Sequence, residues 1–355
     1  MKHLFTAVSL GISMSVSAHA ALNPGDVLFT GQLSNGISVI DDGSAIDLWV
    51  NPDSSARMAT IVQGPDGAYY ISDGRFPGNT ASGILRIDDL FGAPDVSTFA
   101  TGDPFMNPIG LVYDASSQTF LSVNNPAGGG TQGVNEGIIA TNASNGASSL
   151  VYQEPDPATD TPRFNAGNRI TAAPVGGGYF VSSLNGGIDN SGLGGFDSQA
   201  SALYAMREVE GAWVMDAAPA VDFSASVTGL SSDYTNIRGM ATVDGQSSMW
   251  VTDHLAGVLL RVDFDSEGQY LGMVEVLTGL LQPESIVYNE YTGKLIIAER
   301  GDLTDARISS VNLDGSGYEV LYEGDHARGL YVVIPAPAGL AALGLAAIMG
   351  RRRRR

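Results

Sequence analysis

The chain of 355 residues is acidic, with 38 Asp and Glu against 18 Lys and Arg, and it contains no cysteine. The lack of cysteine excludes disulfides, thiolate metal sites and cysteine nucleophiles. The formal net charge of −20 disfavours nucleic acid as a partner, because the field of the protein repels phosphates.

The first 20 residues have the pattern of an export signal. Lys2 supplies a positive start, an apolar segment runs from Leu4 to Val16, and Ala18-His19-Ala20 is the small-x-small pattern that signal peptidases cleave. We therefore expect residues 1–20 to be removed, with the export machinery as a transient partner. Without Lys2 and the five terminal arginines, 12 basic residues remain against 38 acidic ones, so the body carries a net charge of −26.

Short β-rich segments then follow one another along the body. Asp26–Thr30, Gly36–Ile40 and Ile46–Val50 come first. Five hairpins follow, each with turn residues such as Gly, Asp, Asn or Ser and a second strand rich in β-branched and aromatic side chains. The hairpins are Gln63–Asp73, Tyr113–Asn124, Pro174–Ser183, Val243–Asp253 and Tyr288–Glu299.

Further strand pairs follow three of the hairpins. The pairs are Gly83–Asp88 with Thr98–Ala100, Val258–Asp263 with Val274–Leu277, and Ile308–Leu313 with Tyr318–Tyr322. Units of four strands that recur about every 45–65 residues are typical of propeller blades. We therefore predict an all-β, six-bladed β-propeller of four-stranded blades over residues 21–334.

The last β-rich segment predicts how the ring closes. Ala327–Val333 is similar to Ile237–Val243, which we interpret as the innermost strand of a blade. The first blade has only three strands of its own, so we expect this C-terminal strand to complete it. Such closure pairs the inner edge of the first blade, which would otherwise be free.

Two stretches carry a family resemblance. Gly64-Pro65-Asp66-Gly67, which leads into Tyr70-Ile71-Ser72-Asp73, resembles blades of the NHL and SMP-30/gluconolactonase-like propellers. Residues 310–317 are similar to a blade hairpin of the YWTD-type propellers. The resemblance implies a six-bladed propeller, and it implies no particular catalytic residue.

A propeller brings the starts of its innermost strands and the ends of its second strands to one mouth of the central channel. We expect charged residues at these positions to form a ligand site, because arginine and carboxylate groups bind anionic or polyhydroxylated ligands through paired hydrogen bonds. The candidates are Arg57, Arg169, Arg238, Arg328, Glu284, Asp73 and His254. A structural alternative is that the carboxylates bond backbone amides or pair with the arginines.

An oxygen-liganded metal, such as Ca²⁺ or another divalent cation, is a second hypothesis for the same mouth. The SMP-30-like resemblance implies a cation held by Glu, Asn and Asp, and the second-strand ends offer Asn124, Asp253 and Glu299. Only His254 and His326 lie in the body, which excludes a multi-histidine zinc site. No Gly-x-Ser-x-Gly elbow for a serine nucleophile is present.

Residues 335–355 have the pattern of a sorting tail. A proline-containing start is followed by the apolar run Ala338–Gly350 and five arginines. As a helix that run would reach about 20 Å, which is shorter than the roughly 30 Å hydrocarbon core of a bilayer. The tail resembles the PEP-CTERM class of bacterial sorting signals, with Ala336 in place of the glutamate of the usual Val-Pro-Glu-Pro. The resemblance implies a C-terminal processing enzyme as a partner.

Together these features predict an exported protein of the cell envelope, the cell surface or the extracellular matrix. We expect a binding or scaffold module whose partner is an extracellular polysaccharide or another surface protein, and we do not expect an enzyme. The alternative is a metal-dependent hydrolase of the SMP-30/gluconolactonase-like kind.

Overall fold

The computed structural model describes residues 22–32, 34–53, 55–74, 82–124, 137–153, 167–183, 200–229, 233–301 and 305–334. The expected signal peptide at 1–20 and the expected sorting tail at 335–355 lie outside these residues. Within the described residues, no helix is both long and apolar enough to cross a bilayer.

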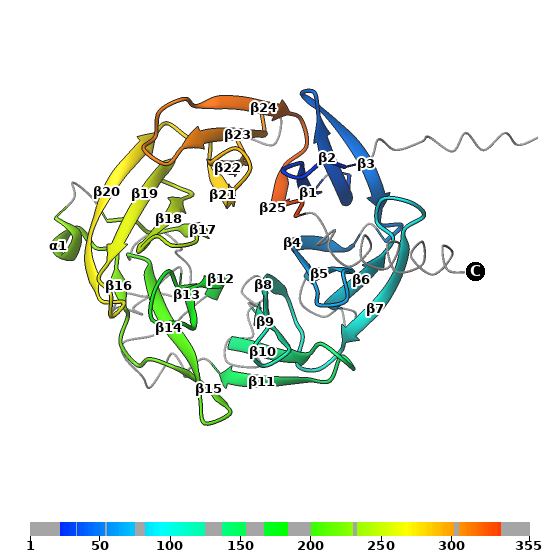
Figure 1. Cartoon of the computed structure of the whole chain (residues 1–355), viewed down its shortest axis with the longest axis horizontal. Coiled ribbons are helices and arrows are strands. Elements are labelled where there is room, and N and C mark those ends of the chain that lie inside the picture. The colour runs from blue at the N-terminus through cyan, green and yellow to red at the C-terminus, as the bar shows by residue number, and fades with distance from the viewer. Residues whose placement is uncertain are drawn as a thin grey trace, which may run out of the picture.

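The described strands form six sheets arranged around a common centre (Figure 1). The first sheet has the order β25-β1-β2-β3 and joins the two ends of the described chain, because β25 (Ala327–Val332) pairs with β1 (Val27–Gly31). β2 (Gly36–Asp41) and β3 (Ser44–Val50) complete this sheet. The predicted all-β fold of six four-stranded blades is thus confirmed.

The other five blades follow in chain order, each starting with its innermost strand. Blade 2 contains β4 (Arg57–Gln63), β5 (Tyr69–Gly74), β6 (Gly83–Asp88) and β7 (Asp95–Thr101), and blade 3 contains β8 (Pro108–Asp114), β9 (Thr119–Asn124), β10 (Gly137–Asn142) and β11 (Ser148–Gln153). Blade 4 contains β12 (Gly167–Ala172), β13 (Tyr179–Ser183), β14 (Ala202–Val209) and β15 (Ala212–Met215), with β16 (Val221–Asp222) as an extra strand on β14.

Blade 5 contains β17 (Ile237–Thr242), β18 (Ser248–Asp253), β19 (Val258–Phe264) and β20 (Tyr270–Thr278), and blade 6 contains β21 (Pro283–Asn289), β22 (Lys294–Glu299), β23 (Arg307–Asn312) and β24 (Glu319–Glu323). A single-turn helix, α1 (Ala225–Thr228), lies between β16 and β17. The sequence pattern did not predict this turn.

Burial follows the position of a strand within its blade. β1, β5 and β13 are buried at every position, whereas the outermost strands β3, β7 and β24 are mostly exposed or half-buried. In the described part of the chain, apolar clusters pack where neighbouring blades meet. One joins Leu28 and Ile37 of blade 1 to Met58 and Ile71 of blade 2. The fold is therefore held by burial between blades, as expected for a chain without disulfides.

Each innermost strand has a break in its pairing register near its start. Arg238, Glu284 and Arg328 lie in such breaks, opposite no residue of the second strand. A β-bulge of this kind re-aims the side chain of the extra residue. Gly329 follows Arg328 where neighbouring blades approach closely, and a Cβ at this position would lie 1.9 Å from the carbonyl oxygen of Ala59. The bulges and tight packing together direct charged side chains toward the channel.

Candidate functional site

The innermost strands β25, β4, β8, β12, β17 and β21 surround the centre of the ring (Figure 1). Their starting residues meet at one end of the channel. Six charged or titratable side chains gather there from blades 1, 4, 5 and 6, and we call them the mouth cluster. They are Arg169, Arg238, Glu284, Arg300, His326 and Arg328.

Glu284 is the carboxylate at the centre of the mouth cluster, and the residue is only 6 % exposed. Its Oε1 accepts a hydrogen bond from Arg238 Nη1 and lies 3.8 Å from Arg300 Nη1, while its Oε2 lies 3.3 Å from His326 Nε2. Burial alone would raise the pKa of this carboxyl. The close contact with His326 and the charges of Arg238 and Arg328 outweigh burial and hold the pKa well below its usual range.

His326 connects Glu284 to the first blade. The side chain is fully buried, and its Nδ1 lies 2.6 Å from Gln32 Oε1, just after β1. The same oxygen accepts hydrogen bonds from Arg328 Nε and Nη2 at 3.3 and 3.2 Å. These contacts tie the start of β25 to the end of β1 within blade 1 and to Glu284 of blade 6.

Arg169 reaches across the channel from blade 4. Its Nη1 donates to the Ile109 carbonyl at 2.6 Å, and its Nη2 donates to the Arg328 carbonyl at 3.0 Å, on the opposite side of the ring (Figure 1). Burial lowers the pKa of Arg169 to about 10. The positive charges of Arg238 and Arg328 also lower this pKa, whereas the negative charge of Glu284 raises it. The backbone N–H of Arg169 donates a hydrogen bond to Ser182 Oγ. In the same way, the backbone N–H groups of Gly239 and Gly329 donate to threonine hydroxyls of their own blades. Arg169 thus takes a position that glycine holds in two other blades.

His254 directly follows β18 and is 4 % exposed. Burial and the charges of Arg238 and Arg300 lower its pKa to about 4, against the opposing effects of Glu284 and a hydrogen bond with the Pro283 backbone. The imidazole is therefore neutral at neutral pH. Its Nδ1 has no hydrogen-bond partner among the described residues.

We expect the low pKa of His254 to make stability rise with pH between about 4 and 6.5. In that window the unfolded chain binds a proton that the folded chain does not, so the free energy of unfolding increases with pH, by up to about 3 kcal/mol. His254→Asn removes this titration. Denaturant midpoints measured across the window should climb less steeply for H254N than for the wild type, and equal slopes would contradict the assignment.

Arg57 and Asp73 lie at the edge of this region, where β4 begins and β5 ends. The Arg57 backbone N–H donates to Asp73 Oδ1 at 3.2 Å, and Asp73 is fully buried. Burial and the nearby charge of Arg328 lower the Arg57 pKa. Asp73 thus binds the backbone at the start of β4, as the structural alternative predicted, while Arg57 adds positive charge beside Arg328.

The three candidate metal ligands hold neighbouring segments of the chain. Asn124 Oδ1 accepts from the backbone of Met106 and Asn107 at 3.0 Å each, and its Nδ2 donates to the Pro104 carbonyl. Asp253 Oδ2 accepts from the Asn236 backbone, and its Oδ1 accepts from the Leu255 and Ala256 backbones. Both side chains therefore fix local loops through their oxygens.

Glu299 is fully buried, and its carboxylate accepts more hydrogen bonds than either of these side chains. Its Oε1 accepts from Ser309 Oγ and Tyr318 OH, and its Oε2 accepts from Arg307 and the Leu281 backbone. Within the described residues, no three His, Asp or Glu side chains cluster as metal ligands. The geometry gives the residues proposed for a cation a structural role.

Sequence reasoning missed Arg300, His326 and Gln32 as parts of the site. Arg300 and His254 each directly follow the end of a second strand, which is the signal that selected His254 and could have selected Arg300. His326 directly precedes β25. Gln32 carries no charge, and its contact with His326 bridges 294 residues of sequence, so no local pattern indicated it.

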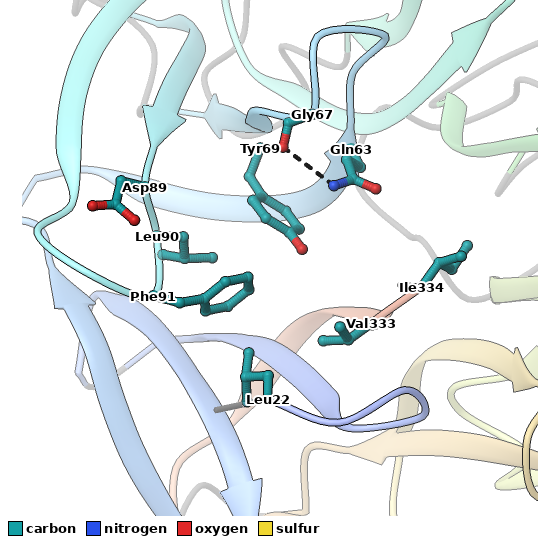
Figure 2. A pocket seen from close by; sticks show the side chains of 9 residues that line it. All are labelled: Leu22, Gln63, Gly67, Tyr69, Asp89, Leu90, Phe91, Val333 and Ile334. Atoms are coloured by element: carbon teal, nitrogen blue, oxygen red, sulfur yellow. Dashed lines mark hydrogen bonds between the residues drawn. The ribbon is translucent and has the colours of Figure 1, made fainter. Parts of the chain in front are cut away.

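A separate pocket of about 310 Å³ lies near the opposite ends of the innermost strands of blades 1 and 2 (Figure 2). Tyr69, Leu90, Phe91 and Val333 give it an apolar lining. The Tyr69 and Phe91 rings pack edge-on, with their centroids 5.5 Å apart. The pocket shares no residue with the mouth cluster and has no cationic lining residue, so the expected anion site does not extend to it.

No protein family profile and no curated protein matches the sequence. Several solved propellers match its fold, and a chain of a nidogen/laminin complex gives a TM-score of 0.60 at 12 % identity, covering 87 % of this chain and 98 % of that one. A putative 6-phosphogluconolactonase from Bacteroides fragilis gives 0.53 at 12 % identity, with 90 % and 99 % covered. The calcium-binding protein regucalcin from Agrobacterium tumefaciens gives 0.50 at 15 % identity, with 85 % and 81 % covered. At these identities the likeness shows a shared fold.

Proposed function

We propose that the protein is an exported propeller that binds an anionic ligand at the mouth cluster and acts as a binding or scaffold module of the cell envelope or its matrix. The observation that carries the proposal is a local reversal of charge. Four arginines surround one carboxylate at the channel mouth, while the body as a whole carries a net charge of −26.

Within the described part of the chain, Glu284 balances only part of the positive charge of the mouth cluster. Among the described residues, Glu284 is the only carboxylate within ion-pair distance of Arg238 or Arg300, and Arg169 and Arg328 form no ion pair. Arg238 and Arg300 are 23 % and 35 % exposed at their side chains, so solvent and solutes reach them. Guanidinium groups held in this way bind carboxylate, sulfate or phosphate groups.

The termini support delivery to the cell exterior. The signal-like residues 1–20 favour export, and the PEP-CTERM-like tail favours sorting by a C-terminal processing enzyme. An acidic extracellular polysaccharide or another surface protein is the partner that this location offers. Nucleic acid is disfavoured because the acidic body repels it.

We expect Arg238→Ala and Arg328→Ala each to weaken binding of an acidic oligosaccharide by about ten- to a hundredfold. A hydrogen bond to a charged group contributes about 1.5–3 kcal/mol, and each substitution removes at least one such donor. Calorimetric titration with trigalacturonate measures the affinity. Arg207→Ala, which removes an equal charge from the outer Arg207–Asp216 pair, is the matched control.

Melting temperatures separate loss of binding from loss of folding in these variants. If the wild type binds no acidic oligosaccharide while the arginine variants merely lose stability, the cluster is structural and the proposal fails. The alternative, a metal-dependent hydrolase, is less well supported because the oxygens of Asn124, Asp253 and Glu299 already accept hydrogen bonds from the protein.

A further inference from the structure

We infer that the anionic group of the ligand is a carboxylate, that Arg300 is the residue that receives it, and that Glu284 is an internal carboxylate around which the site is organised. The inference deepens the proposed function and rests on it.

Arg300 is the least engaged arginine of the mouth cluster. Arg169 bonds two carbonyls, Arg238 bonds Asn236 and Glu284, and Arg328 bonds Gln32. The Arg300 guanidinium, by contrast, makes no hydrogen bond within the described chain and approaches Glu284 only to 3.8 Å. Its side chain is 35 % exposed, so its donors are free to meet a ligand.

The contacts of Glu284 show which anion these donors accommodate. One carboxylate oxygen faces Arg238 and Arg300, and the other faces His326. The cluster is thus already built around a planar group with two oxygens. At this bulge blade 5 carries Arg238, whereas blade 6 carries the carboxylate Glu284. Glu284 holds Arg238 in place. The N–H groups of Arg300 that do not face Glu284 are left for a second carboxylate.

The charge of Glu284 beside the arginines favours a ligand group with a single negative charge. Glu284 Oε1 contacts Arg238 and Arg300, so an anion bound by Arg300 lies close to a carboxylate that is already in place. That carboxylate repels a dianionic phosphate more strongly than it repels a second carboxylate. A uronic acid residue of an acidic polysaccharide carries one carboxylate, so it is the ligand class that we expect.

The experiment compares Arg300→Gln with the control Arg207→Gln, using trigalacturonate and a sulfated trisaccharide of equal charge at fixed ionic strength. The wild type and R207Q should bind the uronate at least about tenfold more tightly than the sulfated probe, and R300Q should lose that preference. Equal binding of both probes, or an unchanged preference in R300Q, would overturn the inference. If no acidic probe binds the wild type, the proposed function itself fails.

A second measurement needs no saccharide. Glu284→Ala should lower the melting temperature, and acetate should restore part of the loss relative to chloride at equal ionic strength, with no comparable gain in the wild type. Glu284→Gln, which fills the space, should show no such rescue. If sulfate restores E284A as well as acetate does, after subtraction of the wild-type response, the cluster does not select carboxylates.

Discussion

A mature chain that ends at Asp325 should fail to form a stable propeller, whereas a chain that ends at Ile334 should melt like the full mature protein. The first truncation removes β25, which pairs with β1 from Val27↔Val332 to Gly31↔Ala327. The second removes only residues that follow the described chain.

The size of the effect follows from what β25 buries. Leu330, Val332 and Val333 are 6–7 % exposed, and full burial of each such side chain contributes about 1.5–3 kcal/mol. Their combined loss approaches the whole stability of a typical domain, about 5–15 kcal/mol. Removing His326 and Arg328 also breaks their contacts with Gln32 and Glu284.

Thermal melts of the two truncations, followed by circular dichroism, measure this difference. The chain ending at Ile334 should give one cooperative transition, and the chain ending at Asp325 should give none or a much lower midpoint. Equal midpoints would show that β25 does not hold the first blade.

Glu299→Ala should lower the free energy of unfolding by about 3–5 kcal/mol, because it removes a fully buried carboxylate and leaves Arg307 without its anion. Ser309, Tyr318 and the Leu281 backbone lose their acceptor as well. Denaturant titration measures the loss.

Glu319→Ala is the matched control in the same blade. Glu319 pairs with Lys294 at 3.4 Å on the exposed surface, so its removal should cost no more than about 1 kcal/mol. Calcium should leave the wild-type melting temperature unchanged. A calcium-induced rise that E299A abolishes would show that Glu299 is a metal ligand and that its structural role has been misjudged.

The fold was predictable because the turn residues and β-rich segments that mark its strands lie close together in the sequence. Gly83–Asp88 was predicted and is β6 to the residue, and the hairpin ending at Asp253 has β18 as its second strand. The outermost strands β3, β7 and β20 were predicted too short, as at Thr98–Ala100 for β7 (Asp95–Thr101). Their alternating exposure, with polar residues facing solvent, weakens the hydrophobic pattern on which such predictions depend.

The position of the candidate site could be predicted from the sequence, whereas only some of its residues could. Alignment of the innermost strands selected Arg238, Glu284 and Arg328, which the register breaks place together at the mouth. Arg300 and His326 join them only through the junction of blades 6 and 1, which no local pattern describes. The intended metal ligands had suitable side chains, but the backbone donors that surround them depend on loop conformation and could not be foreseen.

The central claim, that the mouth cluster is a binding site, is tested most directly by a crystal structure of the mature body with trigalacturonate. We predict a carboxylate of the sugar bound by Arg300 at the mouth cluster. Sugar density confined to the pocket beside Tyr69 and Phe91, or a mouth cluster left without ligand at saturating concentration, would contradict the claim.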